Sequence, residues 1–177
     1  MTTAPAAARR HGDKPFIIRR TFAAPRERVW RAWTAVDELK QWFSANGFTM
    51  AHAAMDLRPG GTFHYGLRSP DGQEMWGKWV FRAITAPERI ELLHSFSDAQ
   101  GGIAVHPMAP TWPRELLSTT TFREEQGHTT VEIRWTVWNG TPEEHQTFDA
   151  DCAHDGMTHG WTGTLDQLAA HLAKNGH

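Results

Sequence analysis

Histidine is the residue type most able to support chemistry in this chain, which contains eleven of them. His94 lies in a stretch, Ile90–Phe96, whose alternate positions are mostly apolar, so its imidazole is predicted to share the inner face of a strand with Leu92 and Phe96. An inward imidazole could act as a general base or orient a ligand, although many inward histidines are hydrogen-bonded core residues. By the same alternation, His64 is predicted to face outward. His94 is therefore the first candidate for acid–base chemistry.

A second group of polar residues lies near the beginning of the predicted C-terminal helix. Asp151 and Asp155 share one helical face, and Cys152 and His154 are close to them in the sequence. His154 and His159 are five residues apart, however, whereas two helical histidines that bind the same metal ion are usually four apart. A metal site formed by Asp151, His154 and Asp155 is the alternative, but we expect exposed polar residues here, with no metal and no cofactor.

The sequence shows no arrangement typical of nucleophilic catalysis. It has no Gly-x-Ser-x-Gly segment, and the glycine-rich turn Pro59-Gly60-Gly61 precedes a predicted strand rather than a helix, so it does not indicate a phosphate-binding loop. Cys152 is the single cysteine, which excludes an internal disulfide and a Cys-x-x-Cys site, and its neighbours do not indicate a catalytic thiol. We therefore predict no catalytic residue set from motifs.

Composition and charge argue against several other classes of function. The net charge is -2, the pI is about 6.6, and Lys and Arg form no run, so neither nucleic acid nor a membrane surface is an expected partner. No stretch is long and apolar enough to span a bilayer. Arg9 and Arg10 are followed by polar residues where a signal peptide would need an apolar segment, which predicts a cytoplasmic protein.

Length and composition predict one domain. Residues 1–14 are rich in Ala, Thr and Arg without periodicity, so we expect a mobile N-terminal tail followed by a single domain over residues 15–174. Nine Trp and nine Phe concentrate the apolar content in large rings. A core built largely from aromatic side chains is the expectation that follows.

Most of the predicted domain is strand and turn. Two short helices follow the first strand; Pro25 opens one, and a candidate capping box, Thr34-Ala35-Val36-Asp37, opens the other. Sequential antiparallel strands with a helix at the end predict an α+β fold. Alternating residues and turn sequences indicate about seven strands: residues 16–22, 48–57, the segment with Phe63, Tyr65 and Leu67, then 75–84, 90–96, 116–122 and 129–138.

The last third of the chain predicts a long amphipathic helix behind a capped start at Thr141-Pro142-Glu143-Glu144. Gly156, Gly160 and Gly163 lie away from its apolar face, and they indicate either the close approach of a neighbouring segment or a bend or break. The gap between this helix and the sheet is the natural place for a ligand. Apolar residues recur every three or four positions on the inner face: Met157, Trp161, Leu165, Leu168 and Leu172.

The longest predicted connection runs from Asp98 to Pro113. It contains three Pro and two Gly, yet it also carries the apolar residues Ile103, Val105, Met108 and Trp112. A loop of this length with apolar content is typical of a lid or binding loop. The alternative is an ordered loop that packs over the sheet edge.

Four segments are similar, in order and spacing, to the START-like (SRPBCC, Bet v 1-type) superfamily, and within it to bacterial homologues of the activator of the heat-shock-protein-90 ATPase. The resemblance covers Phe16 to about Leu172 and implies a helix-grip fold, in which a curved antiparallel sheet wraps around the C-terminal helix and two small helices close one end. The segments are residues 29–33 continuing into 39–43, residues 56–61, residues 86–90 and residues 160–168.

The same resemblance implies a cavity between sheet and helix, which binds a hydrophobic small molecule in many relatives. Those relatives include lipid carriers, polyketide cyclases and aromatases, a self-sacrificing resistance protein against enediynes, and co-chaperones. They share no catalytic residue set, so the resemblance transfers none, and a common fold does not fix a common function.

The leading hypothesis is therefore a protein that binds a hydrophobic or aromatic small molecule in that cavity. One alternative is cyclase- or hydrolase-like acid–base chemistry with His94 as the reactive group; another is a co-chaperone-like interaction module whose partner is a chaperone. We expect a monomer or a homodimer. The predicted ligand-binding residues are Trp33, Phe63, Tyr65, Leu92, His94, Phe96, Met157 and Trp161, with Met108 and Trp112 on the candidate lid.

Overall fold

The computed structural model describes residues 14–44, 47–106 and 108–174, so the predicted tail lies outside the described residues apart from Lys14. This part of the chain contains seven strands: β1 (Phe16–Phe22), β2 (Thr49–Met55), β3 (Thr62–Arg68), β4 (Glu74–Thr85), β5 (Arg89–Ser97), β6 (Leu116–Glu125) and β7 (His128–Val137). It also contains four helices: α1 (Arg26–Thr34), α2 (Val36–Trp42), α3 (Pro142–Ala153) and α4 (Gly156–Lys174).

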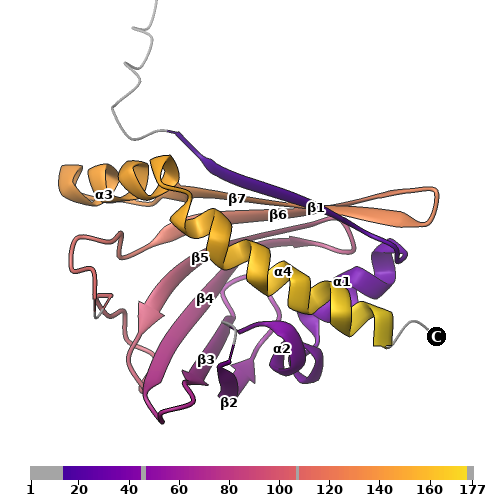
Figure 1. Ribbon diagram of the computed structural model, residues 1–177, viewed down its shortest axis with the longest axis horizontal. Coiled ribbons are helices and arrows are strands. Elements are labelled where there is room, and N and C mark those ends of the chain that lie inside the picture. Colours follow the sequence, from indigo (N-terminus) through magenta and orange to yellow (C-terminus); the bar gives the residue numbers. More distant parts are fainter. Residues whose placement is uncertain (1–13, 45–46, 107, 175–177) are drawn as a thin grey trace, which may run out of the picture.

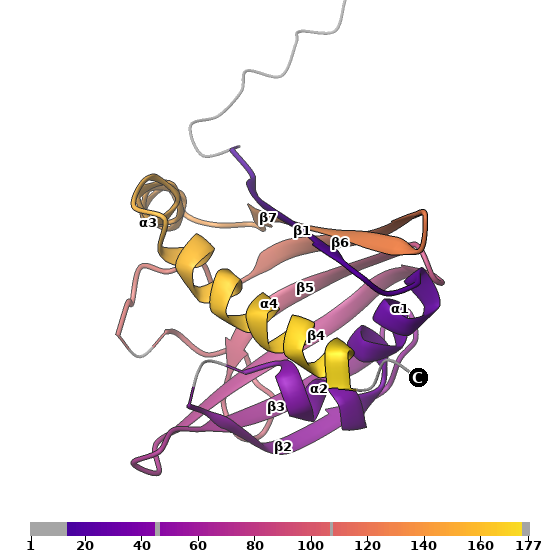
Figure 2. The same ribbon diagram turned by 45° about the vertical axis from the view of Figure 1, so that its right-hand side comes forward.

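The strands form one antiparallel sheet in the order β1-β7-β6-β5-β4-β3-β2. The sheet curves, and α4 crosses its concave side, while α1 and α2 lie at the end of the molecule where α4 terminates (Figure 1). Figure 2 shows the same arrangement after a turn of 45° about the vertical axis, with α3 at the opposite end of α4. The predicted α+β helix-grip fold is confirmed, including the seven strands and the two short helices after the first.

Alternation along the strands decides which side chains face α4. In β3, Phe63, Tyr65 and Leu67 are buried, whereas His64 points outward and its Nε2 lies 3.0 Å from the carbonyl oxygen of Asp98. The predicted inner and outer faces of this strand are therefore confirmed.

The apolar stripe of α4 is buried, as its spacing predicts. Trp161 stacks on Trp33 of α1 with ring centroids 6.1 Å apart, and it meets Trp135 of β7 edge-on at 5.6 Å. Through Trp161, α4 thus contacts both β7 of the sheet and the first small helix, α1. The buried members of the stripe are Met157, Trp161, Leu165, Leu168 and Leu172.

The helical region after Thr141 is two helices rather than one, because the helical conformation is interrupted between α3 and α4. Asp155 has a φ of 57°, in the left-handed region. One carboxylate oxygen of Asp151 accepts the backbone N–H of Met157 at 2.8 Å, which satisfies a free donor at the start of α4. A Cβ at Gly156 would collide with the other oxygen of that carboxylate, so Gly156 belongs to the break.

Close approach does not explain the other two glycines of α4. A Cβ on Gly160 or on Gly163 would meet no atom within 4 Å. The sequence left two explanations open, close approach of a neighbouring segment or a break in the helix. The break explains Gly156, and close approach explains neither Gly160 nor Gly163.

The two predicted capping boxes have different outcomes. At α3 the box is confirmed: the Thr141 hydroxyl accepts the N–H of Glu144 at 3.2 Å, and the Glu144 carboxylate accepts the N–H of Thr141 at 3.0 Å. At α2 the prediction is wrong. Thr34 is the last residue of α1, where its hydroxyl donates to the Trp30 carbonyl at 2.8 Å, and Ala35 occupies the N-cap of α2 without a side-chain bond.

A mostly buried carboxylate ties the helices together. Glu38 of α2 forms ion pairs with Arg28 and Arg31 of α1 at 2.7 and 3.0 Å, and its Oε1 lies 2.9 Å from Nε2 of His171 in α4. Only 14% of the Glu38 side chain is exposed, and 5% of that of His171. This Glu38 cluster therefore joins α1, α2 and the C-terminal half of α4.

Candidate functional site

A hollow with two lobes lies between the concave face of the sheet and α4. The loop-side lobe has a volume of about 270 Å³ and is bordered by the α3–α4 junction and by four loop residues, His106, Ala109, Trp112 and Pro113. The strand-side lobe has a volume of about 300 Å³ and is bordered by β3 and α4. Both lobes share one wall, which consists of His94, Phe96, Trp135 and Met157.

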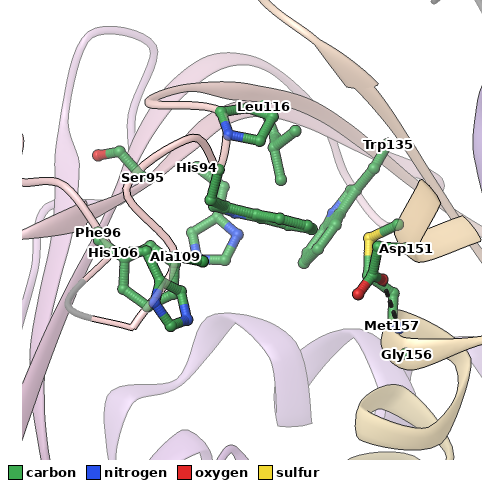
Figure 3. Close-up of a pocket in the computed structure, with 12 residues that line it drawn as sticks. His94, Ser95, Phe96, His106, Ala109, Leu116, Trp135, Asp151, Gly156 and Met157 are labelled. Carbon is green, nitrogen blue, oxygen red and sulfur yellow. Dashed lines mark hydrogen bonds between the residues drawn. The ribbon is translucent and has the colours of Figure 1, made fainter. Parts of the chain in front are cut away.

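Figure 3 shows how the loop-side lobe is framed. Phe96 and His106 lie on one side, with ring centroids 4.6 Å apart, and Met157 and Asp151 lie on the other. Trp135 is held by a hydrogen bond from its indole Nε1–H to the hydroxyl of Ser118, 3.0 Å long. Rings from β5, from β7 and from the 98–113 loop therefore face one another across this lobe.

A third, deep pocket lies beneath the lobes. It measures about 10 Å³, which is room for a single water-sized group. It shares Phe43, His94, Trp135 and Trp161 with the strand-side lobe, so the two are adjacent. The rest of its lining is Trp33, Trp79, Ile90, Leu92, Ser118 and Thr120.

Tyr65 and His94 form the polar pair of the hollow, with the phenol oxygen 3.0 Å from Nε2 of the imidazole. Burial lowers the pKa of His94 to about 4 and raises the pKa of Tyr65 above its ordinary value. At neutral pH both groups are therefore uncharged, and the pair can offer hydrogen bonds but no formal charge.

Gly77 provides the space that allows Tyr65 and His94 to come within hydrogen-bond distance. It lies opposite Tyr65 in the register of β3 and β4, and β4 separates β3 from β5, which carries His94. A Cβ on Gly77 would overlap the phenol ring of Tyr65, so the ring crosses β4 directly above this glycine. The absence of a side chain there allows Tyr65 to reach His94.

Gly77→Ala is expected to lower the free energy of unfolding by about 1–3 kcal/mol, because the new methyl group forces the Tyr65 ring away from His94. Urea denaturation of both proteins measures the difference. Tyr65→Leu supplies the control: in its background the same Gly77→Ala change is expected to cost much less. An equal cost in both backgrounds would contradict the contact.

The charge of the lining is low. Within the described part of the chain, the ionisable residues that line the two lobes are Tyr65, His94, His106 and Asp151, and none is Lys or Arg. Burial lowers the pKa of His106 as well. An anion in the hollow would therefore find no neighbouring positive charge among these residues.

The described residues of the 98–113 loop pack against the rim of the hollow. Ile103 pairs with Ser97 as an isolated bridge, and the ring of Trp112 lies 6.0 Å from that of Phe148 in α3. Met108 is 87% exposed and lines neither lobe. The packed-loop alternative describes this arrangement, and whether the loop also opens stays a prediction.

The predicted ligand-binding residues separate into three groups. Met108 and the fully buried Phe63 line none of these pockets; Phe63 is covered by Phe43, Tyr65 and Trp79. Trp33 and Leu92 line only the deep pocket. Those that line the lobes are Tyr65, His94, Phe96, Trp112, Met157 and Trp161.

Sequence reasoning missed several residues that line the hollow. Trp135 lines both lobes and the deep pocket, and its position on the apolar face of β7 could have indicated this. Phe43 follows α2 and had no periodic signal that pointed to the hollow. His106 lies in the aperiodic loop, where no pattern indicates orientation.

No group of three His, Cys, Asp or Glu side chains that could hold a metal ion occurs among the residues that the structure describes. Asp151 instead caps α4. None of the helices in the described ranges has the length and apolar character needed to cross a membrane.

Comparison with known families places this architecture. Residues 23–173 match the family described as "Activator of Hsp90 ATPase homolog 1-like protein" (AHSA1). The chain belongs to the AHSA1 family. The resemblance inferred from the sequence motifs is thereby confirmed, and the AHSA1 match runs from just after β1 through nearly all of α4, so it includes both walls of the hollow.

Solved structures of bacterial proteins share this AHSA1 architecture. A solution structure from Arthrobacter aurescens has a TM-score of 0.74 at 24% identity, covering 97% of this chain and 93% of that chain. A crystal structure from Mycobacterium smegmatis has a TM-score of 0.72 at 24% identity, covering 90% and 91%. A solution structure from Staphylococcus epidermidis has a TM-score of 0.69 at 26% identity, covering 91% and 90%. No curated protein matches the sequence.

Proposed function

We propose that this AHSA1-family protein binds a hydrophobic or aromatic small molecule in the hollow between the sheet and α4. The observation that carries the proposal is the shared wall of His94, Phe96, Trp135 and Met157, which two lobes of about 270 and 300 Å³ have in common. Ligand sites are typically concave and mostly apolar, with few polar groups. The Tyr65–His94 pair supplies such a polar group.

Burial of apolar surface supplies the binding free energy in this proposal, at roughly 25 cal/mol per Å² removed from water. We assign the function to one cytoplasmic domain, residues 15–174, because its sheet, the segment that follows α2 and α4 all contribute to the walls. A native mass spectrum of the purified protein would report both a co-purified ligand and whether the chain is a monomer or a homodimer.

Gly160→Phe is expected to block the strand-side lobe. Gly160 lines this lobe, and open space surrounds its missing Cβ, so the phenyl ring can enter without straining the helix. We expect the affinity for 2-isopropylnaphthalene, a neutral hydrocarbon probe, to fall at least about tenfold, which is ~1.4 kcal/mol. Quenching of tryptophan fluorescence during titration measures the affinity.

Gly163→Phe is the matched control, since Gly163 lies on the same helix with equally open surroundings but lines neither lobe. It should bind the probe as the unmodified protein does. Equal affinities for all three proteins would show that the ligand lies elsewhere, and an unmodified protein that binds no apolar probe would overturn the proposed function.

Two other functions have observations in their favour. The hydrogen-bonded Tyr65–His94 pair would suit acid–base chemistry of the cyclase or hydrolase type on a bound molecule. Ile103, Val105 and Met108, which are 47%, 43% and 87% exposed, would suit contact with a chaperone. An interaction module would keep its partner in the Gly160→Phe protein, whereas a ligand-binding protein would lose its ligand.

A further inference from the structure

One side chain that lines the deep pocket carries a buried hydrogen-bond donor without an acceptor. The Trp33 side chain lines this pocket, its residue is only 3% exposed, and its indole Nε1–H has no hydrogen-bond partner in the described part of the chain. A buried donor without a partner is unfavourable, so native proteins rarely retain one unless water or a ligand satisfies it.

Hydroxyl groups replace apolar side chains on the facing strand. The inner face of β6 runs Leu116, Ser118, Thr120, Phe122, and all four residues are buried. Ser118 and Thr120 line the deep pocket together with Trp33. The Ser118 oxygen already accepts the Trp135 N–H, which leaves its own O–H to donate.

The pocket is therefore rich in donors and free of positive charge. Its lining contains no Lys or Arg within the described residues, and His94 is its one ionisable group. An acceptor oxygen without charge fits this environment, whereas a carboxylate or phosphate would be buried without a counter-charge. The volume of about 10 Å³ admits one such oxygen and no larger group.

We propose that the deep pocket binds the carbonyl oxygen of a neutral ligand, which accepts the Trp33 Nε1–H and the Ser118 O–H while the apolar body of the ligand occupies the strand-side lobe. The ligand class is thus an uncharged apolar or aromatic molecule with a ketone or ester group, rather than a fatty acid or another anion. This inference rests on the proposed function, because it names the ligand class of the same hollow.

Three probes of similar shape test it: 2-acetylnaphthalene, 2-isopropylnaphthalene and 2-naphthoate, titrated at neutral pH by isothermal calorimetry. Trp33→Phe removes the N–H and keeps an aromatic ring. It should lower the affinity for 2-acetylnaphthalene by about fivefold to tenfold, the factor that one net hydrogen bond supplies. The affinity for 2-isopropylnaphthalene should change less than about twofold. In the unmodified protein, 2-naphthoate should bind more weakly than the ketone.

Trp79→Phe controls for lost ring volume in the same pocket, and it should affect ketone and hydrocarbon equally. Ser118→Ala keeps every aromatic ring, so it provides a second test if the Trp33→Phe protein does not fold. It should also lower the affinity for the ketone selectively. Equal weakening of ketone and hydrocarbon by both Trp33→Phe and Ser118→Ala, or a carboxylate that binds as tightly as the ketone, would overturn this inference alone. Failure of every probe to bind would overturn the proposed function itself.

Discussion

Trp161→Ala is expected to lower the free energy of unfolding by about 3–5 kcal/mol, the range for large-to-small changes of aromatic core residues. Trp161 is 9% exposed, and its ring contacts Trp33 of α1, Phe43 after α2 and Trp135 of β7. Its loss would leave α4 without its main aromatic contact to the sheet. The rings around it are fixed on strands and helices, so they can fill little of the space.

Chemical denaturation followed by far-ultraviolet circular dichroism measures this effect. Thr162→Ala is the control, because Thr162 is the next residue of α4 and is exposed; it should change stability by less than about 0.5 kcal/mol. A Trp161→Ala protein as stable as the Thr162→Ala protein would contradict the packing of α4 across the concave face.

The second large effect is a loss of stability in acid that depends on His94. Burial lowers the pKa of His94 from its ordinary 6.5 to about 4, so between these values the unfolded chain binds a proton that the folded protein does not. Unfolding therefore takes up a proton, and stability falls as the pH drops from about 6.5 to about 4. The contribution of His94 to this fall is at most about 3 kcal/mol.

His94→Gln should remove this contribution while keeping a side chain that can hydrogen-bond to Tyr65. Urea denaturation of both proteins at a series of pH values between about 7 and 4 gives the difference in stability at each pH. The same substitution at His64, on the outer face of β3, controls for the loss of a histidine as such. Parallel pH curves for the His94→Gln and unmodified proteins would contradict the buried, neutral imidazole.

The features that were predictable from the sequence depend on short-range periodicity. The inward faces of β3 and β5 and the apolar stripe of α4 follow from alternation and from helical spacing, because burial on one side selects apolar residues at fixed intervals. The Thr141 capping box was equally readable, since its partner residues lie within one turn. The cap and the stripe were each correct, but the single long helix that they predicted together is two helices, α3 and α4.

The features that were not predictable depend on contacts between distant segments. Phe63 and Trp135 both point inward, yet Phe43 and Trp79 cover the first, while the second lines the hollow. That difference arises from sheet curvature and from the position of α4, which no local pattern encodes. Met108 belongs to an aperiodic loop, so its outward orientation had no signal at all.

Competition between neighbouring elements explains the error at Thr34. The sequence Thr34-Ala35-Val36-Asp37 fits a helix start, but α1 extends through Thr34. The Thr34 hydroxyl donates its hydrogen bond to the Trp30 carbonyl oxygen. A side chain that ends one helix in this way is not available to begin the next.

The two ends of α4 are held by different kinds of contact, and the Glu38 cluster makes the C-terminal end the more firmly fixed. Near its C-terminus, His171 contacts Glu38 of α2, and Glu38 also pairs with Arg28 and Arg31 of α1. Of these four side chains, His171, Glu38 and Arg28 are mostly buried, so the contacts among them are difficult to separate. At the other end, the Asp151 cap and the packing of Met157 hold the helix beside the hollow. Thermal widening of the hollow is therefore expected to be asymmetric, greatest where α4 faces the 98–113 loop and smallest where it meets α1 and α2.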